Sequence, residues 1–204
     1  MTITVYEKDI PANLDLGNAI AVDTETMGLN TERDRLCLVQ LSSGDGNAHL
    51  VKIAAGQKDA PNLKKMLENT KTLKLFHFAR FDLCALRFGL GIDCRPIYCT
   101  RTASRLARTY TDKHGLKDNC RELLGIDLNK QQQTSDWGAD VLSDDQKAYA
   151  ASDVLYLHQL KEKLDTMLAR EGRTELAQAC FDFLPARAQL DLAGWPEIDI
   201  FAHE

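Results

Sequence analysis

The chain has 204 residues, of which 44% are hydrophobic and 27% charged, which suits one domain with a sizeable core. No apolar run reaches the length of a membrane span, and residues 1–16 lack the basic-then-apolar pattern of a signal peptide, so we expect a cytoplasmic protein with no membrane partner. The net charge of −5 disfavours a protein that grips long duplexes by neutralising many phosphates, and it favours small substrates.

The first half of the chain predicts mainly strands, because short apolar segments alternate with turn residues. A cluster of Ser, Gly, Asp and Asn at residues 42–47 predicts an antiparallel hairpin between the third and fourth strands. Two short helices are predicted at Pro61–Glu68 and Asp82–Phe88, the second ending near Gly89 and Gly91. The predicted strands are Ile3–Tyr6, Ala19–Glu25, Arg35–Leu41, Ala48–Ile53 and Leu73–Phe78.

The second half predicts helices. Ser143 and Gln146 have the spacing of a capping box, so a helix should begin there and continue through Leu164 or beyond. Gly194 and Pro196 end the last helix, and the alternating segment Glu197–Phe201 predicts a short strand. The other predicted helices are Arg101–Tyr110, Leu116–Leu124 and Arg173–Leu190.

No repeat, low-complexity tract or linker divides the chain. Strands followed by helices around a mixed sheet indicate the α/β class. We therefore expect a single domain over residues 1–204, with a catalytic core at about 19–164 and a helical segment and tail at about 165–204. The six cysteines form no C-x-x-C pair and no zinc-finger spacing with histidine, so we expect reduced, buried thiols.

Four acids and a tyrosine have spacings that can bring their side chains together. Asp23 and Glu25 lie two apart in a predicted strand, so both carboxylates point to one face. Asp82 follows an apolar strand, and Tyr149 and Asp153 lie four apart on a predicted helix, where they share a face. Taken singly, these are also ordinary features: solvated acids at a strand end, a helix-start residue, and an unremarkable helical pair.

The joint order of these motifs is the signature of the DEDD exonuclease superfamily in its Tyr-x-x-x-Asp form. The neighbouring residues resemble ribonuclease D over roughly residues 19–164. The resemblance implies a ribonuclease H-like mixed β-sheet flanked by helices and a 3′–5′ exonuclease that releases nucleoside 5′-monophosphates. The matching segments are His77-x-Ala79-x-Phe81-Asp82, Gln133-Thr134-Ser135-Asp136-Trp137 and residues 142–157.

The resemblance also implies a site for two divalent cations, Mg²⁺ or Mn²⁺, which prefer oxygen ligands. Asp23, Glu25 and Asp153 would hold one ion, and Asp23 with Asp82, through water, the other. Tyr149 would orient the attacking water, because a phenol with a pKa near 10 is a poor base at neutral pH. The five residues would together form the catalytic set.

Four further residues are candidates for substrate binding. By resemblance, Met27, Gly28 and Leu29 lie beside the terminal nucleotide, where Gly28 allows close backbone approach and Leu29 can wedge against a base. The alternative is an ordinary loop with one buried apolar residue. His77 either contacts the substrate or closes a buried strand as a structural residue.

Basic side chains recur at helical spacing at Arg101, Arg105 and Arg108. Such a stripe either guides a phosphate backbone or is a solvated helix face. The same two interpretations apply to a second set: His114, Lys117 and Arg121.

The compact length and the ending at residues 190–201 resemble the bacterial nanoRNase C family, which implies cleavage of short single-stranded RNA, especially diribonucleotides such as pGpG. The family also implies a ring-like homo-oligomer, an octamer being one such ring. One departure is His77-Phe78, where much of the wider superfamily has His-Asn. The alternatives are a general ribonuclease D-like RNA-trimming enzyme, a DNA 3′–5′ exonuclease, a noncatalytic nucleic-acid-binding scaffold and a structural protein.

Overall fold

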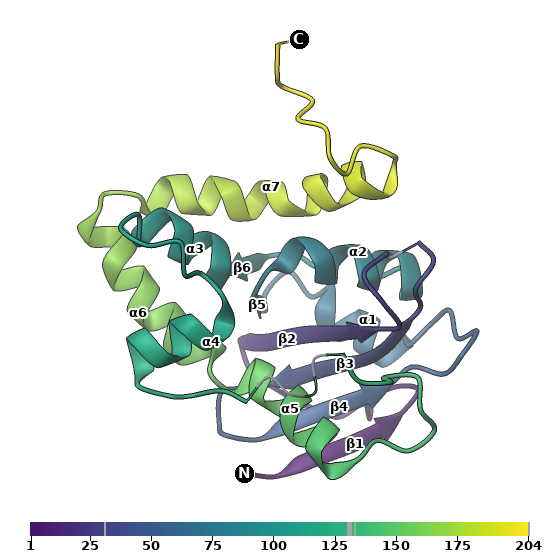
Figure 1. Cartoon of the computed structure of the whole chain (residues 1–204). Coiled ribbons are helices and arrows are strands. Elements are labelled where there is room, and N and C mark those ends of the chain that lie inside the picture. The colour runs from purple at the N-terminus through teal and green to yellow at the C-terminus, as the bar shows by residue number, and fades with distance from the viewer. Residues whose placement is uncertain (31, 130–131, 133, 204) are drawn as a thin grey trace.

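Six strands form one mixed sheet in the order β1-β4-β3-β2-β5-β6 (Figure 1). The computed structural model describes residues 1–30, 32–129, 132 and 134–203. Strands β2, β3 and β4 are antiparallel neighbours, whereas β1 pairs in parallel with β4, β5 with β2, and β6 with β5. The predicted α/β class with a mixed sheet is confirmed. The strands are β1 (Ile3–Glu7), β2 (Ala19–Thr26), β3 (Leu36–Ser42), β4 (Ala48–Lys52), β5 (Leu73–Phe76) and β6 (Ile97–Cys99).

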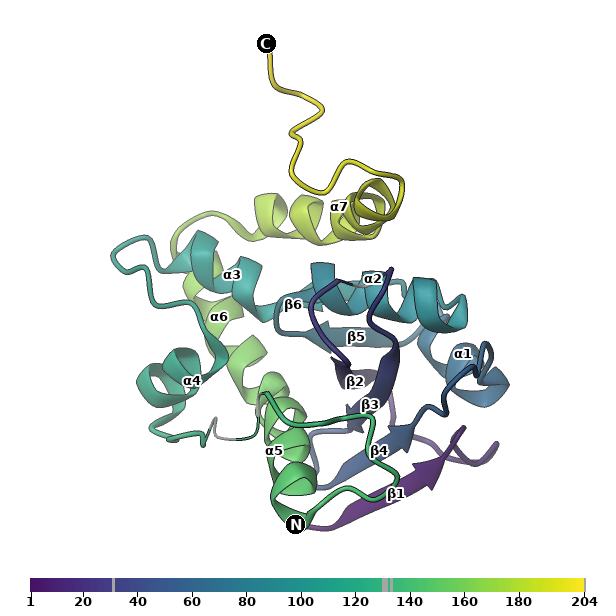
Figure 2. The same cartoon turned by 45° about the vertical axis from the view of Figure 1, so that its right-hand side comes forward.

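The helices surround this sheet. Helix α5 packs against β3 and β4, and α7 packs along α2. In both views α7 is the helix farthest from β1, and the C-terminal tail extends beyond it (Figure 1, Figure 2). None of the described helices combines the length and hydrophobicity of a membrane span. The helices are α1 (Pro61–Leu67), α2 (Ala79–Leu90), α3 (Thr100–Ala107), α4 (Leu116–Asn119) with a π-helical turn at Cys120–Leu124, α5 (Asp144–Leu155), α6 (Leu157–Arg170) and α7 (Thr174–Leu192).

The predicted hairpin joins β3 to β4. Gly44 and Gly46 both have positive φ, 81° and 84°, which glycine adopts without steric cost. The Ser42 hydroxyl donates to the carbonyl of Asn47 at 2.7 Å and closes the turn. A side chain at Gly44 would also meet the His158 ring, so this turn packs directly against α6.

The two faces of the sheet bury different clusters. Residues opposite one another on antiparallel strands share a face. On one face Val22 pairs with Leu41, and both lie in the large core to which α1, α2, α6 and α7 contribute. On the other face Leu38 and Leu50 pack with Ala150 of α5 in a smaller cluster. The smaller cluster leaves room on that face for polar groups at the end of β2.

The predicted capping box is confirmed. The Gln146 amide N–H donates to the Ser143 hydroxyl at 3.1 Å, and the Ser143 N–H donates to the Gln146 side chain at 2.9 Å. The prediction of one continuous helix from there through Leu164 is wrong, because α5 ends at Leu155 and α6 begins after Tyr156. The hydrophobic period is helical on both sides of the break, so the sequence does not reveal the bend.

The predicted strand Glu197–Phe201 is also wrong: the described tail contains no strand. Its backbone is held by hydrogen bonds from arginine side chains and not by pairing with the edge of the sheet.

Strand β6, only three residues long, was not predicted, since so short a segment gives no periodic signal. Helix α2 begins three residues before the predicted start and α3 ends three residues before the predicted end. All six cysteines are free thiols and five are buried, as expected.

Asp191, near the end of α7, joins the C-terminal tail to α2. The Arg80 guanidinium donates to Asp191 at 2.6 Å, and Arg187 donates to the same carboxylate at 2.6 Å. The two arginines also donate to the carbonyls of Pro196 and Trp195. Burial alone would raise the pKa of Asp191, but the hydrogen bonds and charges of Arg80 and Arg187 hold it below its usual range.

We predict that Asp191→Asn lowers the free energy of unfolding by about 2 kcal/mol at neutral pH, because it leaves two arginines without their shared partner. A depressed carboxyl pKa contributes stability above the unfolded-state pKa, and this stability is lost as pH falls through the folded-state value. The difference from wild type should therefore be constant at neutral pH and shrink in acid. Urea unfolding measures it, with the more exposed Asp182→Asn on the same helix as control. A difference that persists unchanged in acid would contradict this account.

Candidate active site

Asp23 and Glu25 project from the same face of β2, as predicted from their spacing. Their neighbours across the β2–β3 pairing are Gln40 and Leu38. The Gln40 side-chain amide donates to Asp23 at 3.1 Å and fixes one carboxylate oxygen. The preceding residue Val22 is fully buried on the opposite face, so a one-residue slip of β2 would bury the acids.

Helix α5 brings a third carboxylate to the pair. Ala150 and Ala151 are fully buried, and their small side chains let the helix approach the sheet closely. One carboxylate oxygen each from Asp23, Glu25 and Asp153 lies within 4.8 Å of the others. Carboxylates this close repel one another unless a cation lies between them. Three oxygen donors suit a hard divalent cation such as Mg²⁺ or Mn²⁺, so the residues fit the implied metal site.

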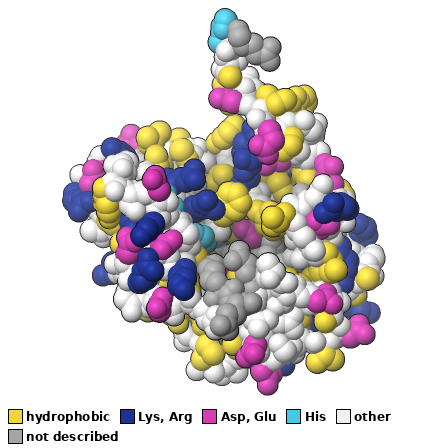
Figure 3. All heavy atoms as spheres, viewed as in Figure 1, with side chains coloured by type: hydrophobic (Ala, Val, Ile, Leu, Met, Phe, Trp, Pro, Cys, Tyr) yellow, Lys and Arg dark blue, Asp and Glu magenta, His cyan; other side chains and the backbone are white. Residues whose placement is uncertain are grey.

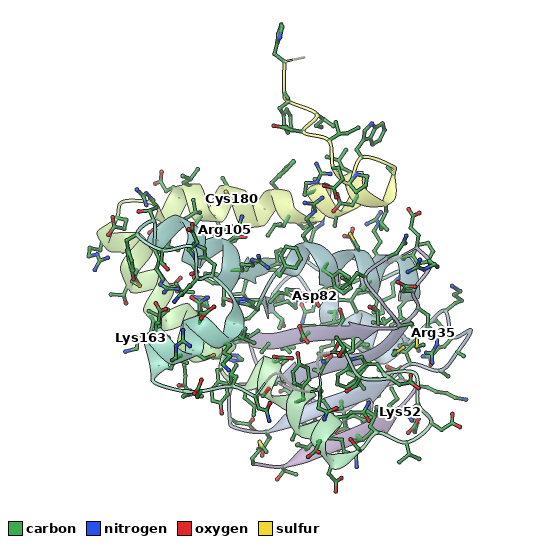
Figure 4. All side chains as sticks on the ribbon, in the orientation of Figure 1. Arg35, Lys52, Asp82, Arg105, Lys163 and Cys180 are labelled. Atoms are coloured by element: carbon green, nitrogen blue, oxygen red, sulfur yellow. The ribbon has the colours of Figure 1, made fainter. Side chains whose placement is uncertain are left out.

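Asp82 approaches from the other side of β2 and is not a member of that cluster (Figure 4). Strand β5 pairs only with residues 19–21 of β2, so the edge of β2 beyond them faces the start of α2. The Thr24 hydroxyl donates to Asp82 at 2.7 Å. Burial raises the pKa of Asp82 to about 7. Hydrogen bonds from Thr24 oppose this rise, and the negative charge of Asp153 adds to it. A role for Asp82 in metal binding stays a prediction.

Tyr149 lies one turn before Asp153 on α5, and its side chain is 7% exposed. Its ring packs against Trp137 with the ring centroids 5.9 Å apart. Burial raises the pKa of the Tyr149 phenol, and the negative charges of Asp153 and Glu25 raise it further. In the metal-free protein the phenol therefore keeps its proton at neutral pH and can donate a hydrogen bond.

The sequence did not single out Gln40 and Thr24, which support the acids. Gln40 is fully buried in a strand whose other residues are mostly apolar. A single polar residue in such a strand is the feature of the sequence that could have marked it as part of the site. Thr24 gave no signal, because its role depends on where α2 lies. Trp137, from the motif that resembles ribonuclease D, is buried against the site, whereas Gln133 of that motif lies outside the described residues.

The segment Met27–Leu29 forms an exposed loop after β2, as the substrate-binding prediction requires. Leu29 is 88% exposed, which excludes the alternative of a buried apolar residue. A Cβ atom at Gly28 would lie 2.3 Å from a carboxylate oxygen of Asp34. The same oxygen accepts the N–H of Asn30 at 3.0 Å. Gly28 is thus needed for the loop to close over Asp34, and contact with a substrate stays a prediction.

His77 and two of the predicted arginines lie beside the start of α2. The His77 ring is hydrogen-bonded to the Thr100 hydroxyl at 2.8 Å, which attaches α3 to the end of β5. Arg101 is partly exposed and Arg105 exposed on α3, and neither forms an ion pair with another described residue. Hydrophobic side chains lie beside Lys, Arg and His side chains in the middle of this face (Figure 3). Both arginines remain candidates for substrate binding.

Arg108 does not belong to the basic stripe, and that part of the prediction is wrong. Its side chain is fully buried. It donates to Asn119 at 2.9 Å and forms an ion pair with Glu122. Helical spacing placed it with the exposed arginines, but α3 ends at Ala107 and the chain turns inward.

The second basic set is divided among internal contacts. The His114 ring is hydrogen-bonded to the Ser104 hydroxyl at 2.9 Å. Arg121 forms an ion pair with Asp118 at 2.8 Å. These contacts disfavour a phosphate-guiding role for His114 and Arg121.

We predict that Mn²⁺ or Mg²⁺ raises the melting temperature of the metal-free protein by about 5 °C at saturating concentration, because the ion relieves repulsion among three carboxylates. Asp23→Asn should abolish this increase and should melt no lower than wild type in chelator. Glu162→Gln, an exposed acid on α6, serves as the control. Differential scanning calorimetry with and without chelator measures the shift, and an equal shift in wild type and Asp23→Asn would contradict the assignment.

Comparison with known proteins identifies the family to which this arrangement belongs. Residues 5–169 match the 3′–5′ exonuclease family. The ribonuclease D of a Jannaschia species is 34% identical over 167 residues, which cover 78% of this chain and 43% of that protein, so the chain spans less than half of its length. The DNA polymerase I of Aquifex aeolicus is 37% identical over 147 residues, 72% of this chain and 24% of that protein.

Solved structures match over the whole chain. NrnC of Brucella melitensis bound to pGG is 55% identical, with a TM-score of 0.95 and 100% of both chains covered. The same protein with bound Mg²⁺ is 54% identical, with a TM-score of 0.93 and the same coverage. The chain therefore belongs to the 3′–5′ exonuclease family, in the ribonuclease D-like DEDD branch close to NrnC.

Proposed function

We propose that the chain is a 3′–5′ exoribonuclease that hydrolyses short RNA, above all diribonucleotides such as pGpG, to nucleoside 5′-monophosphates. The observation that carries this proposal is the convergence of Asp23, Glu25 and Asp153 within 4.8 Å, with Tyr149 beside them. Carboxylates so arranged suit divalent ions, and phosphodiester hydrolysis by such ions is the chemistry of the family to which the chain belongs.

Asp23, Glu25 and Asp153 would hold one ion, and Asp82 with Asp23 would contribute to a second. Bound Mg²⁺ or Mn²⁺ supplies positive charge that polarises the scissile phosphate and the attacking water. The buried carboxyl of Asp82, with its pKa raised to about 7, becomes a better anion once a cation is near. Gln40 holds Asp23 in place, and Thr24 holds Asp82.

Tyr149 positions the nucleophile by donating a hydrogen bond. In the metal-free protein its raised pKa favours the protonated phenol, which can donate a hydrogen bond. Packing against Trp137 limits rotation of the ring, so the hydroxyl direction is fixed before substrate arrives.

Three observations favour a short RNA as the substrate. NrnC of Brucella melitensis, 55% identical over the whole chain, has a solved structure with bound pGG. The net charge of −5 is unsuited to gripping a long phosphate backbone. Arg101 and Arg105 offer a small basic patch beside the acids rather than a long groove, because Arg108 is buried and Arg121 is paired.

The ribonuclease D relative favours one alternative, a general RNA-trimming enzyme, and the DNA polymerase I relative favours another, a DNA 3′–5′ exonuclease. The same carboxylates could serve all three functions. The enzymes would differ in how they contact the 2′-hydroxyl and how many nucleotides they hold.

We further propose that copies of the chain assemble into a homo-oligomer in the cytoplasm. The tail carries Trp195, Ile198 and Phe201 at 44%, 53% and 75% exposure, so its apolar side chains are not buried by its own domain. Free thiols at all six cysteines suit a reducing compartment. Light scattering should give a mass well above the 22.8 kDa of one chain, and a monomer mass would contradict assembly.

We predict that Tyr149→Phe lowers kcat by about 10- to 100-fold, the worth of one hydrogen bond to a charged group, and leaves Mn²⁺ affinity unchanged. Because the folded-state pKa of Tyr149 is raised, its phenol should not titrate below about pH 10. The pH–rate profiles of wild type and variant should therefore have the same shape. Tyr156→Phe is the control, and an alkaline limb present in wild type but absent from Tyr149→Phe would contradict this role.

The length preference is tested by single-turnover cleavage of 5′-labelled RNAs of two to ten residues with Mg²⁺, beside DNA of equal lengths. We expect the diribonucleotide to react fastest and Asp23→Ala to be inactive. Equal trimming of long and short RNA would instead make this a general ribonuclease D-like enzyme. Faster cleavage of DNA than of RNA would favour the exonuclease alternative.

A further inference from the structure

Phe78 holds an aromatic ring at the surface, four residues before Asp82. Its backbone is left-handed, with φ 79° and ψ 45°, a conformation that bulky residues rarely adopt. Its side chain is 44% exposed. A strained backbone that exposes a large apolar ring gains nothing for the core, so the position of this ring calls for another role.

The residues around Phe78 form one side of a site in which a flat ring could stack. The Arg101 guanidinium lies over the ring, 4.6 Å from its centroid. Ring and guanidinium line a pocket together with Leu184 of α7 and Arg105. The hydrogen bonds from His77 to Thr100, and from the Thr100 hydroxyl to the carbonyl of Phe76 at 3.1 Å, fix the start of α3 and hence Arg101. The guanidinium covers one face of the ring, so a base would stack on the opposite face.

The pocket is lined by the first residues of α2, the helix that carries Asp82. Phe78 precedes Asp82 by one helical turn. Phe78 follows the end of β5 and Met27 follows the end of β2, so the two residues belong to separate segments after neighbouring parallel strands.

We propose that Phe78 is a stacking platform for one unpaired nucleobase of the substrate, namely the base that does not lie against Met27–Leu29. This inference rests on the proposed function. Arg101 holds the ring in place, and Arg105 supplies charge near the attached phosphate. Stacking on an aromatic ring tolerates any base, since every base has a π-face. A stacking contact at Phe78 and an apolar contact at Leu29 would together engage both bases of a dinucleotide.

Steady-state kinetics test this platform with intact diribonucleotides and with diribonucleotides that lack one base. Phe78→Gly removes the ring and suits the left-handed backbone, so it should fold. Its KM should rise about tenfold at unchanged kcat, and Phe78→Tyr should restore the wild-type KM. The matched control is Phe88→Ala on the same helix, a ring 46% exposed with Lys58 above it at 5.8 Å, which should change neither constant.

Removing the base at one of the two positions should raise the wild-type KM by a similar factor and have no further effect in Phe78→Gly. Removing the base at the other position should raise the KM of Phe78→Gly further, by the same factor as in wild type. It should not change the KM of Leu29→Ala. An unchanged KM in Phe78→Gly would overturn the platform. So would base removal that, at both positions, raises KM by the same factor in wild type and in Phe78→Gly.

A binding measurement separates this inference from the proposed function. In the Asp23→Asn background, a dinucleotide containing 2-aminopurine should lose fluorescence on binding, and Phe78→Gly should abolish the loss. A wild type that hydrolyses no RNA would end the proposed function, yet Phe78-dependent quenching would still support the platform. Hydrolysis by wild type with quenching independent of Phe78 would keep the function and overturn the platform.

Discussion

The site depends on the alternation of side chains along β2. Asp23 and Glu25 can share one face only because Ile20 and Val22 are buried on the other, which fixes the strand in register. The buried Ala150 and Ala151 then bring α5 close enough for Asp153 to join them. The fold thus holds like charges together against their repulsion, and a divalent cation is the group that turns this arrangement from a cost into a binding site.

The start of α2 connects three parts of the molecule within five residues. Phe78 presents its ring to the pocket on α3, Arg80 reaches Asp191 and the tail, and Asp82 reaches the edge of β2. A shift of this helical turn would move the acid, the ring and the tail together. If the tail contacts a second copy of the chain, assembly and the catalytic geometry are therefore mechanically linked through Arg80.

The parts of the structure that follow from local periodicity could be predicted from the sequence. Asp23 with Glu25 at strand spacing and Tyr149 with Asp153 at helical spacing each share a face, and the capping box at Ser143 marks the start of α5. Features set by distant packing could not be predicted. Arg108 is buried by Asn119 and Glu122, the helix breaks at Tyr156 where the period continues, and the tail takes its path from Arg80 and Arg187 rather than from its own alternating pattern.

The central claim is that the carboxylates hold divalent ions against the scissile phosphate. A diribonucleotide in which sulfur replaces one nonbridging oxygen of that phosphate tests it directly, because Mg²⁺ binds sulfur poorly and the softer Mn²⁺ binds it better. The two diastereomers would be compared in single-turnover hydrolysis with each ion. We expect one diastereomer to be hydrolysed far more slowly than the oxygen substrate with Mg²⁺ and to recover with Mn²⁺. Equal hydrolysis of both diastereomers with Mg²⁺, and no change with Mn²⁺, would contradict direct contact between the ions and the phosphate.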